Sequence, residues 1–424
     1  MNPSIRKLFL PVLIACSPCL LSAADYPQWR GPHRSGISPE TNLLQEWPGT
    51  GPKLRWKITN LGSGYSAPAV VRDRIFILAN EGMENEFVLA LSATDGQRLW
   101  QTRLGNVGNP KQDPNFPAAR STPTVEGNLL WALGSDGDLA CLESTTGAIQ
   151  WQHNLRSDFG GKPGTWAYAE SPLVDGDLLI CTPGGPEATI VALDKKTGQT
   201  VWKCPLPEAG DAAYASAIPV QTGDLRQYVQ LLQKGLFAVE ARTGHFLWRY
   251  AKPTSRFDAN IPTPLSSDGC IYVASAGTGA GAIRLEVNSG SVEVRELYFG
   301  PRFPTAIGGV VKHGDFLYGT TDQSLVCLEF LTGQVKWQER ALGAASICLA
   351  DNRLYLHGEN GDVALVEPSP SSYTLKGRFT PPDQPKRKNQ MEKAWAYPVV
   401  ADGRLYIRDH NVLWCYDVRR LTSQ

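Results

Sequence analysis

The sequence predicts an all-β fold, an eight-bladed β-propeller of four-stranded antiparallel blades closed by an N-terminal strand that completes the C-terminal blade. Three observations support this prediction. An acidic residue, a turn, a glycine and a tryptophan recur together along the chain. The 424 residues include 41 glycines and 31 prolines, more turn-forming residues than a helical protein would carry. The last repeat lacks one strand, which an unpaired segment near the N-terminus can supply.

The repeat is clearest in Leu193–Trp202, where Asp194 is followed four positions later by Gly198 and eight positions later by Trp202. The other copies, aligned on the acidic position, run from Ser92 to Trp100, Glu143 to Trp151, Glu240 to Trp248, Glu286 to Val294, Glu329 to Trp337 and Glu367 to Leu375. The tryptophan positions repeat at about 38 to 51 residues, a period typical of four-stranded propeller blades.

This spacing has a structural explanation. An apolar strand ends at the acidic residue, whose carboxylate can accept hydrogen bonds from the turn. The glycine permits the positive φ that closes the turn. The next strand carries the tryptophan, a flat side chain large enough to cover the seam with the neighbouring repeat. We therefore interpret the acids and tryptophans as structural rather than catalytic residues.

Each unit adds four strands in order. The first complete unit predicts strands over 67–71, 74–80, 87–91 and 98–103. Later units open on a small residue and a proline, as in Ser171-Pro172, and turn on pairs such as Asp175-Gly176 before the hairpin that ends in tryptophan. The final unit predicts only three strands, over 396–400, 404–409 and 412–417. A strand around Trp56 has no partners before it, so it is predicted to complete that blade and remove an open sheet edge.

The domain prediction is a signal peptide over 1–24, an N-terminal arm over 25–53, the propeller over 54–418 and a tail over 419–424. Arg6 and Lys7 precede a short apolar core, and small residues precede Asp25, as in a secretory leader. The alternative is a bacterial lipobox that makes Cys16 a lipid-bearing N-terminus at the outer membrane. Both interpretations predict a secreted or periplasmic protein. The arm is expected to lie across the first blades, held by Trp29 and Arg30.

Charge and cysteine content narrow the function classes. The formal net charge is zero, which argues against a nucleic-acid partner. Seven of the nine cysteines lie outside the leader, mostly in apolar strand runs, and are interpreted as small buried hydrophobic residues rather than a disulfide framework. No metal-spaced histidine pair, phosphate loop or catalytic triad order is present. We expect a monomer.

The loops before the inner strands form one rim of a propeller channel. Aromatic, arginine and carboxylate residues at the ends of those loops predict a site for a protein partner or a small planar or anionic ligand. The predicted site residues are Tyr65, Arg120, Tyr168, Glu170, Tyr214, Asn260, Arg302, Trp395 and Tyr397. The alternative is a solvated rim whose aromatic side chains pack beneath the loops. A Pro-rich loop over 379–395 adds the basic run Lys386-Arg387-Lys388.

The repeat resembles the tryptophan-docking repeat of pyrroloquinoline quinone (PQQ) propellers. The matching segments are Cys141–Trp151, Ala192–Trp202, Val239–Trp248 and Cys327–Trp337. That superfamily includes PQQ- and calcium-dependent alcohol dehydrogenases, the non-catalytic propeller lipoprotein of the outer-membrane barrel-assembly machinery, and secreted PQQ-like proteins. The opening Trp29-Arg30-Gly31-Pro32 is similar to the start of many members of the last group.

The resemblance implies two functions. The first is a secreted, non-catalytic binding or scaffolding module with its site at the channel mouth. The alternative is a PQQ- and calcium-dependent oxidoreductase, with Glu170 and Asn260 as calcium ligands and Asp258 as the base. The dehydrogenases use an adjacent Cys-Cys pair against the quinone and are longer, and this chain has no such pair. We therefore favour the first hypothesis.

Overall fold

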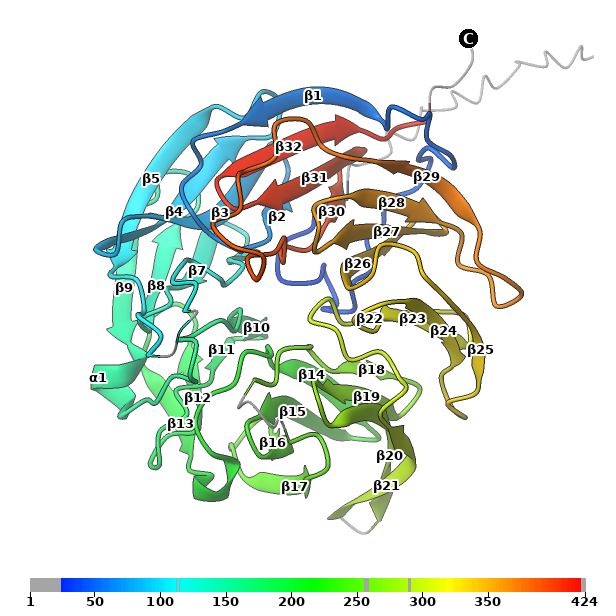
Figure 1. Cartoon of the computed structure of the whole chain (residues 1–424). Helices are drawn as coiled ribbons and strands as arrows, with labels where there is room; N and C mark the ends of the chain where they lie inside the picture. The colour runs from blue at the N-terminus through cyan, green and yellow to red at the C-terminus, as the bar shows by residue number, and fades with distance from the viewer. Residues whose placement is uncertain (1–23, 112, 114, 255–258, 289–290, 421–424) are drawn as a thin grey trace, which may run out of the picture.

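The protein is an eight-bladed β-propeller (Figure 1), which confirms the predicted fold class. The computed structural model describes residues 24–111, 113, 115–254, 259–288 and 291–420. Eight four-stranded antiparallel sheets surround a central axis, and each blade runs outward from its first strand. No helix within these residues is long and apolar enough to cross a membrane. The predicted leader, with Cys16, lies outside the described residues.

The strands follow the chain from blade to blade. Blade one consists of β2 (Ala69–Val71), β3 (Arg74–Glu81), β4 (Asn85–Ser92) and β5 (Arg98–Gly105), and blade two of β6 (Thr124–Glu126), β7 (Leu129–Leu133), β8 (Asp138–Glu143) and β9 (Ile149–Asn154). Blade three consists of β10 (Leu173–Asp175), β11 (Leu178–Cys181), β12 (Ile190–Asp194) and β13 (Thr200–Cys204), and blade four of β14 (Ile218–Thr222), β15 (Leu225–Leu232), β16 (Gly235–Glu240) and β17 (Phe246–Tyr250). Blade five consists of β18 (Leu265–Ser267), β19 (Cys270–Ser275), β20 (Gly279–Asn288) and β21 (Ser291–Gly300), and blade six of β22 (Val310–His313), β23 (Phe316–Thr320), β24 (Leu325–Glu329) and β25 (Val335–Glu339). Blade seven consists of β26 (Ala345–Ala350), β27 (Arg353–Gly358), β28 (Val363–Val366) and β29 (Leu375–Phe379), and blade eight of β30 (Val399–Ala401), β31 (Arg404–Asp409), β32 (Val412–Asp417) and β1 (Lys53–Ile58). Two short helical turns, α1 (Leu155–Phe159) and η1 (Pro207–Ala209), lie on loops between blades.

The ring closes as the repeat count predicts. β1 pairs antiparallel with β32, so the eighth blade has the order β1-β32-β31-β30. The register joins Lys53 to Asp417 and Ile58 to Leu413, with an irregularity between Leu54 and Trp56. The first and last strands of the propeller are therefore held together in one sheet.

The core lies between adjacent blades. Each apolar cluster joins facing sides of two neighbours, such as Ile180 of blade three and Tyr228 of blade four, and the largest joins blades seven, eight and one. Tryptophans of the fourth strands cover these seams. The indole of Trp151 donates to the Lys195 carbonyl oxygen at 3.2 Å, and that of Trp202 donates to Ala241 at 3.1 Å. The indoles of Trp56, Trp100 and Trp337 bind the hairpin turn of the next blade in the same way, whereas that of Trp248 donates to Gln227 of its own blade at 2.7 Å.

Two eroded repeats use substitutes for the missing tryptophan. In blade five, where Val294 stands at the tryptophan position, the hydroxyl of Tyr298 donates to the Phe330 carbonyl oxygen of blade six at 2.8 Å. Trp47, from the N-terminal arm, packs 5.4 Å from Phe379 of blade seven between ring centroids. Aromatic cover of the seam is therefore retained where the motif is lost.

Gly198 offers a test of this docking. Its φ is +75°, and a Cβ there would lie 2.8 Å from Cδ2 of Trp151. Gly198→Ala should lower the free energy of unfolding by about 2–4 kcal/mol, because left-handed strain and overpacking against the indole add together. Gly176→Ala is the matched control, since its φ of +59° is similar but nothing lies within 4 Å. Equal losses in urea unfolding for the two variants would contradict the docking role.

The N-terminal arm lies in the channel and binds inner strands around most of the ring. Its bonds, in blade order, are Tyr26 to Val70, Pro27 to Val125, Arg34 to Ser171 and Pro172, Trp29 to Thr263, Arg30 to Val310, and Ser38 to Leu349 and Val400. The arm does bind the first blades as expected, with Trp29 and Arg30 among the residues that hold it, but it also extends to blades five to eight. Both Arg30 and Arg34 are buried, and backbone carbonyl oxygens accept their hydrogen bonds.

Candidate functional site

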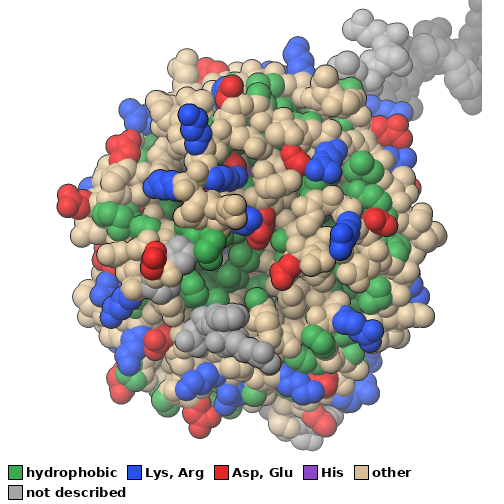
Figure 2. Space-filling model, viewed as in Figure 1, with side chains coloured by type: hydrophobic (Ala, Val, Ile, Leu, Met, Phe, Trp, Pro, Cys, Tyr) green, Lys and Arg blue, Asp and Glu red, His purple; other side chains and the backbone are tan. Residues whose placement is uncertain are grey.

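An apolar cavity of about 450 Å³ opens at the mouth of the channel. Figure 2 shows a hollow with hydrophobic side chains near the centre of the viewed face. Its walls come from the arm and from the loops that lead into the inner strands. The lining residues are Trp29, Tyr65, Phe116, Arg120, Trp166, Ala169, Tyr214, Ala259, Ile261, Ile307, Met391, Trp395 and Tyr397. Segments far apart in the sequence meet here because every blade directs its inner strand at the axis.

Paired aromatic rings make the walls. Trp395 lies 4.9 Å from Tyr65 and 5.4 Å from Phe116 between ring centroids. Trp29 meets Tyr397 edge to face at 4.5 Å. The hydroxyl of Tyr397 donates to the Ile307 carbonyl oxygen at 2.7 Å, which fixes that ring. Rings held by each other and by the backbone present a large apolar area without needing to be ordered on binding.

Arg120 is the charged residue among those lining the cavity. Its guanidinium lies 5.4 Å from the Tyr65 ring centroid, and Nη2 donates to the Phe116 carbonyl oxygen at 2.5 Å. Its Nε is buried without a hydrogen-bond partner, and no carboxylate of the described residues forms an ion pair with it. Burial lowers the pKa of Arg120 from its ordinary value, but arginine remains charged in proteins.

A polar side hollow of about 500 Å³ adjoins this cavity and shares Tyr65 and Phe116 with it. Lys386 and Lys388, both exposed, lie along it. An ion pair and a contact between a histidine and a carboxylate fix the loop that carries these lysines, and burial lowers the pKa of that histidine, His410. Arg387 Nη2 lies 2.5 Å from Asp409, and His410 Nε2 lies 3.1 Å from Glu392. The mouth thus combines an apolar cavity with a polar margin on one side, where the two lysines lie in the same hollow as Asp113 and Glu392.

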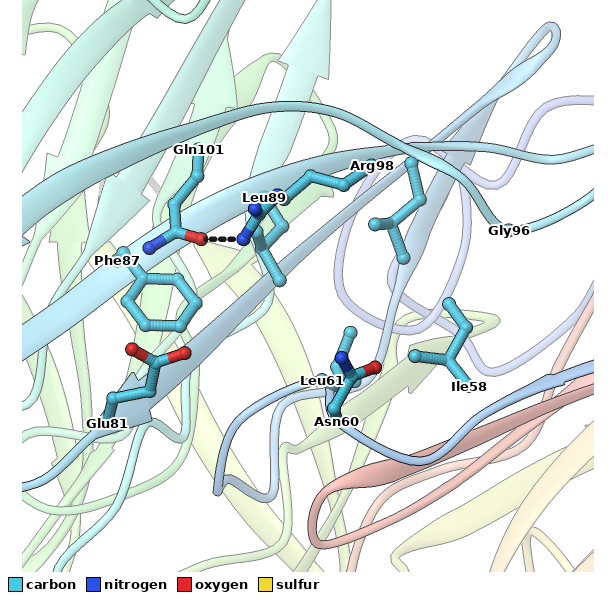
Figure 3. A pocket seen from close by; sticks show the side chains of 10 residues that line it. Ile58, Asn60, Leu61, Glu81, Phe87, Leu89, Gly96, Arg98 and Gln101 are labelled. Atoms are coloured by element: carbon cyan, nitrogen blue, oxygen red, sulfur yellow. Dashed lines mark hydrogen bonds between the residues drawn. The ribbon is translucent and has the colours of Figure 1, made fainter.

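Another hollow lies on the outside of the ring, at the seam between β1 and the first blade (Figure 3). Ile58 and Leu61 face Phe87 across about 260 Å³, and Arg98 donates to Gln101 at 2.7 Å. Its shape follows from the packing of two blades, and it faces away from the channel. The mouth cavity is therefore the stronger candidate.

Comparison with known proteins gives the family. The sequence profile of the family described as "Outer membrane protein assembly factor BamB" matches residues 40–166 and 84–339. The chain belongs to this family. It is one of the PQQ-like propeller families, which confirms the resemblance seen in the repeats.

Individual BamB relatives are distant. A BamB of Shewanella oneidensis is 25% identical over 322 residues, which cover 73% of this chain and 72% of the relative. A BamB of Salmonella typhimurium is 29% identical over 141 residues, which cover 33% of this chain and 31% of the relative. With that relative, the match thus spans about a third of its length.

Solved structures agree on the fold. BamB from Moraxella catarrhalis superposes with a TM-score of 0.60 at 16% identity, covering 88% of this chain and all of that one. A quinohemoprotein alcohol dehydrogenase from Pseudomonas putida gives 0.65 at 13% identity, covering 94% and 81%. At such identities these likenesses show the propeller fold alone.

The cavity brings together five of the residues that the sequence predicts for the site, Tyr65, Arg120, Tyr214, Trp395 and Tyr397. They occupy the positions directly before inner strands of four blades. The other lining side chains were not among the predicted residues. Trp166, Phe116 and Met391 lie within long loops, where no strand alternation indicates which side chains face inward. Their aromatic or apolar character in a predicted rim loop was the available signal.

The other four predicted residues lie outside the cavity lining. Tyr168 is buried and its hydroxyl donates to the Pro183 carbonyl oxygen at 2.8 Å. Arg302 is exposed on the loop before β22. The amide of buried Asn260 donates to the carbonyl oxygens of Leu232 and Pro253 at 2.6 and 2.9 Å. Those bonds hold the loop before β18.

Glu170 lies behind the wall of the cavity. Its carboxylate accepts hydrogen bonds from the Thr182 amide and from Gln230 Nε2, and it is 3% exposed. Burial raises its pKa to about 7. The backbone explains why the sequence misplaced Tyr168, since Ala167 has a φ of +71° and interrupts the inward-outward alternation after Trp166.

The described residues do not fit PQQ and calcium at the mouth. Calcium takes six to eight oxygen ligands, yet the lining holds no carboxylate. Glu170 accepts hydrogen bonds from Thr182 and Gln230, and Asn260 has a buried Oδ1 without a partner, but neither residue lines the cavity. Asp258 lies outside the described residues. No group of three His, Cys, Asp or Glu residues in the described ranges could hold a metal ion. The seven cysteines outside the leader are buried and unpaired, and none lines the cavity.

Glu170 predicts a pH dependence of stability. Its pKa rises from 4.5 in the ordinary carboxyl to about 7 in the folded protein, so the folded state binds the extra proton. The stabilising contribution is fully present below about pH 4.5 and is lost as the pH rises through about 7. Glu170→Gln stays neutral and should therefore be more stable than the parent at about pH 8, by roughly 3 kcal/mol, and similar at about pH 5.

Thermal unfolding across this range checks the prediction. Glu143→Gln is the control, because hydrogen bonds from Thr145 and Thr146 hold the pKa of that exposed carboxyl at about 2. It stays ionised throughout the range, so its replacement should leave the slope unchanged. An unaltered slope for Glu170→Gln would show that Glu170 is ionised in the folded protein.

Proposed function

We propose that this chain is a non-catalytic, protein-binding scaffold of the bacterial cell envelope that takes part in outer-membrane protein assembly. Its BamB family membership supports this role, since its relatives are named as outer membrane protein assembly factors. The observation that carries the binding site is the aromatic cavity at the channel mouth. Aromatic residues and arginine are the types enriched where proteins bind one another.

A protein partner suits this site better than an enclosed small ligand. Met391, on the rim, is 58% exposed, so the apolar surface continues out of the cavity. Exposed apolar area joined to a pocket is typical of a protein-binding surface. The arm fills the channel beside the cavity, and Trp29 contributes to the cavity wall. A partner would therefore insert side chains from the open face.

The proposed location follows from the leader. Residues 1–24 would direct export, with cleavage before Asp25 or lipidation at Cys16 as the two alternatives. Mass spectrometry of the mature protein distinguishes these alternatives, because the lipid-bearing product would begin at Cys16. An uncleaved chain that stays in the cytoplasm would contradict the envelope role.

Site-specific photo-crosslinking in the intact envelope tests the proposed function. A photoreactive residue at Met391 should give a discrete adduct with an envelope protein, and that adduct should be lost when Trp395 is replaced by alanine. Phe246 is the matched control position, since it is 50% exposed but lies on the outer strand β17. Adducts of equal yield at the two positions, or none at Met391, would refute the mouth as the binding surface.

A further inference from the structure

We propose that the mouth binds an acidic peptide segment of a protein partner, with a bulky aromatic side chain as its anchor and a neighbouring carboxylate bound by Arg120. This inference rests on the proposed function and names the chemistry of the partner. Three observations carry it: a half-buried arginine without an ion pair, an aromatic cavity beside it, and two exposed lysines on the way out.

The first observation is the electrostatic state of Arg120. A charge withdrawn from water is costly unless it is paired and hydrogen-bonded, yet the half-buried Arg120 forms one hydrogen bond, to the Phe116 carbonyl oxygen, and its Nε is buried without a partner. The carboxylate that interacts electrostatically with Arg120 is Glu86, which forms no ion pair with it. That group is fully buried and accepts hydrogen bonds from the Ser135 amide and hydroxyl. Arg120 therefore lacks a close anionic partner among the described residues.

Arg120 differs from the buried arginines in what its terminal nitrogens face, although Arg30 and Arg34 also have an Nε without a hydrogen-bond partner. Arg34 donates to two backbone carbonyl oxygens and Arg408 to several, so each has acceptors on its terminal nitrogens. Those arginines hold blades together. Arg120 instead faces a cavity, and its planar donors match the geometry of a carboxylate.

The second observation is the apolar cavity beside the guanidinium. Trp395, Phe116 and Trp166 form an apolar volume of about 450 Å³, which is large enough for an aromatic side chain. An occupant must therefore present apolar and anionic groups close together. A residue pair such as Phe beside Glu or Asp meets both requirements, since adjacent side chains reach the cavity and its charged wall at once.

The third observation sets the charge of the flanking segment. The side hollow that shares Tyr65 and Phe116 with the cavity carries the exposed Lys386 and Lys388, and it is also lined by Asp113 and by Glu392, which accepts a hydrogen bond from the Lys388 amide at 2.6 Å. Neither ammonium forms an ion pair with a described residue, whereas Arg387 between them is paired with Asp409. A chain leaving the cavity on the lysine side of this hollow can place carboxylates beside those two ammonium groups and away from Asp113.

Fluorescence anisotropy with a short, capped, labelled peptide tests this inference on the mature protein. The probe carries phenylalanine flanked by glutamate and aspartate, and matched probes replace the phenylalanine with alanine or the acids with lysine. Only the acidic aromatic peptide should bind, and its affinity should fall as salt increases. Arg120→Gln should weaken binding by roughly tenfold or more.

Two further variants keep the result interpretable if Arg120→Gln perturbs folding. Lys386→Gln with Lys388→Gln changes exposed residues, and the pair should weaken binding several-fold and reduce its salt dependence. Arg98→Gln, at the outer seam, is the control and should bind like the parent. Equal binding of all three peptides, or unchanged affinity in the double lysine variant and in Arg120→Gln, would overturn the inference. If the photoreactive residue at Met391 forms the adduct with an envelope protein but the three peptides bind equally well, this inference is refuted and the proposed function stands.

Discussion

Replacement of Arg408 by leucine is expected to lower the free energy of unfolding by about 3–5 kcal/mol. Arg408 lies on β31 with its side chain fully buried, and it donates to the Ser66 and Leu78 carbonyl oxygens at 3.0 and 2.6 Å. It also donates to the His410 carbonyl oxygen at 3.0 Å. Leucine would leave these buried acceptors without donors, and each unsatisfied group costs about 1–3 kcal/mol.

The position of Arg408 makes the effect a test of ring closure. Ser66 and Leu78 belong to the first blade, whereas Arg408 belongs to the last, so its guanidinium bridges the two ends of the propeller. Arg55→Leu is the control on the same blade, because Arg55 pairs with Asp417 at the surface and should contribute less than about 1 kcal/mol. Urea unfolding of both variants, with limited proteolysis at the seam, measures the difference. Similar losses for the two would show that Arg408 does not stabilise the closure.

The repeats made most of this fold predictable. The repeated acid, glycine and tryptophan positions predict a local turn and also a contact between neighbouring blades. The close approach of Gly198 to Trp151 is an example of that contact. Once the period was known, the surplus strand around Trp56 and the deficit at the C-terminus could be matched. Strand pairing between β1 and β32 follows from counting, because an unpaired edge is unfavourable.

The arm and the site were less predictable because they lack a period. The segment around Trp29 alternates neither as a strand nor as a helix, so its sequence does not reveal that it binds inner strands on seven blades. Side-chain direction in the rim loops depends on single backbone torsions, such as the positive φ of Ala167. Residues adjoining inner strands, including Tyr65 and Tyr397, could be placed because the strand fixes them. Tyr298 could not be identified as a tryptophan substitute, since it does not stand at the tryptophan position of its repeat.

Removal of β1 is expected to have the largest effect. A chain that starts at residue 60 would lose the strand paired with β32 and the docking of Trp56, whose indole donates to the Ala93 carbonyl oxygen at 3.1 Å. Trp56 is half-buried, so its loss alone costs up to about 3 kcal/mol, and the β1–β32 pairing is lost with it, against the roughly 5–15 kcal/mol of a typical folded protein. The exposed edge of β32 would also invite pairing between molecules. We expect oligomers or aggregates in light scattering, with a lowered Tm.

A circularly permuted chain tests whether the effect comes from the absence of β1 itself or from the changed position of the chain start. If residues 24–59 follow residue 420 through a flexible linker, β1 and the arm are both present and β32 can recover its partner. That chain should be monodisperse, with a Tm close to that of the parent. The same linker carrying residues 24–52 alone restores the arm without the strand, and it should fail to rescue. Rescue by the arm alone, or a stable monomer without either segment, would show that β1 is not what closes the ring.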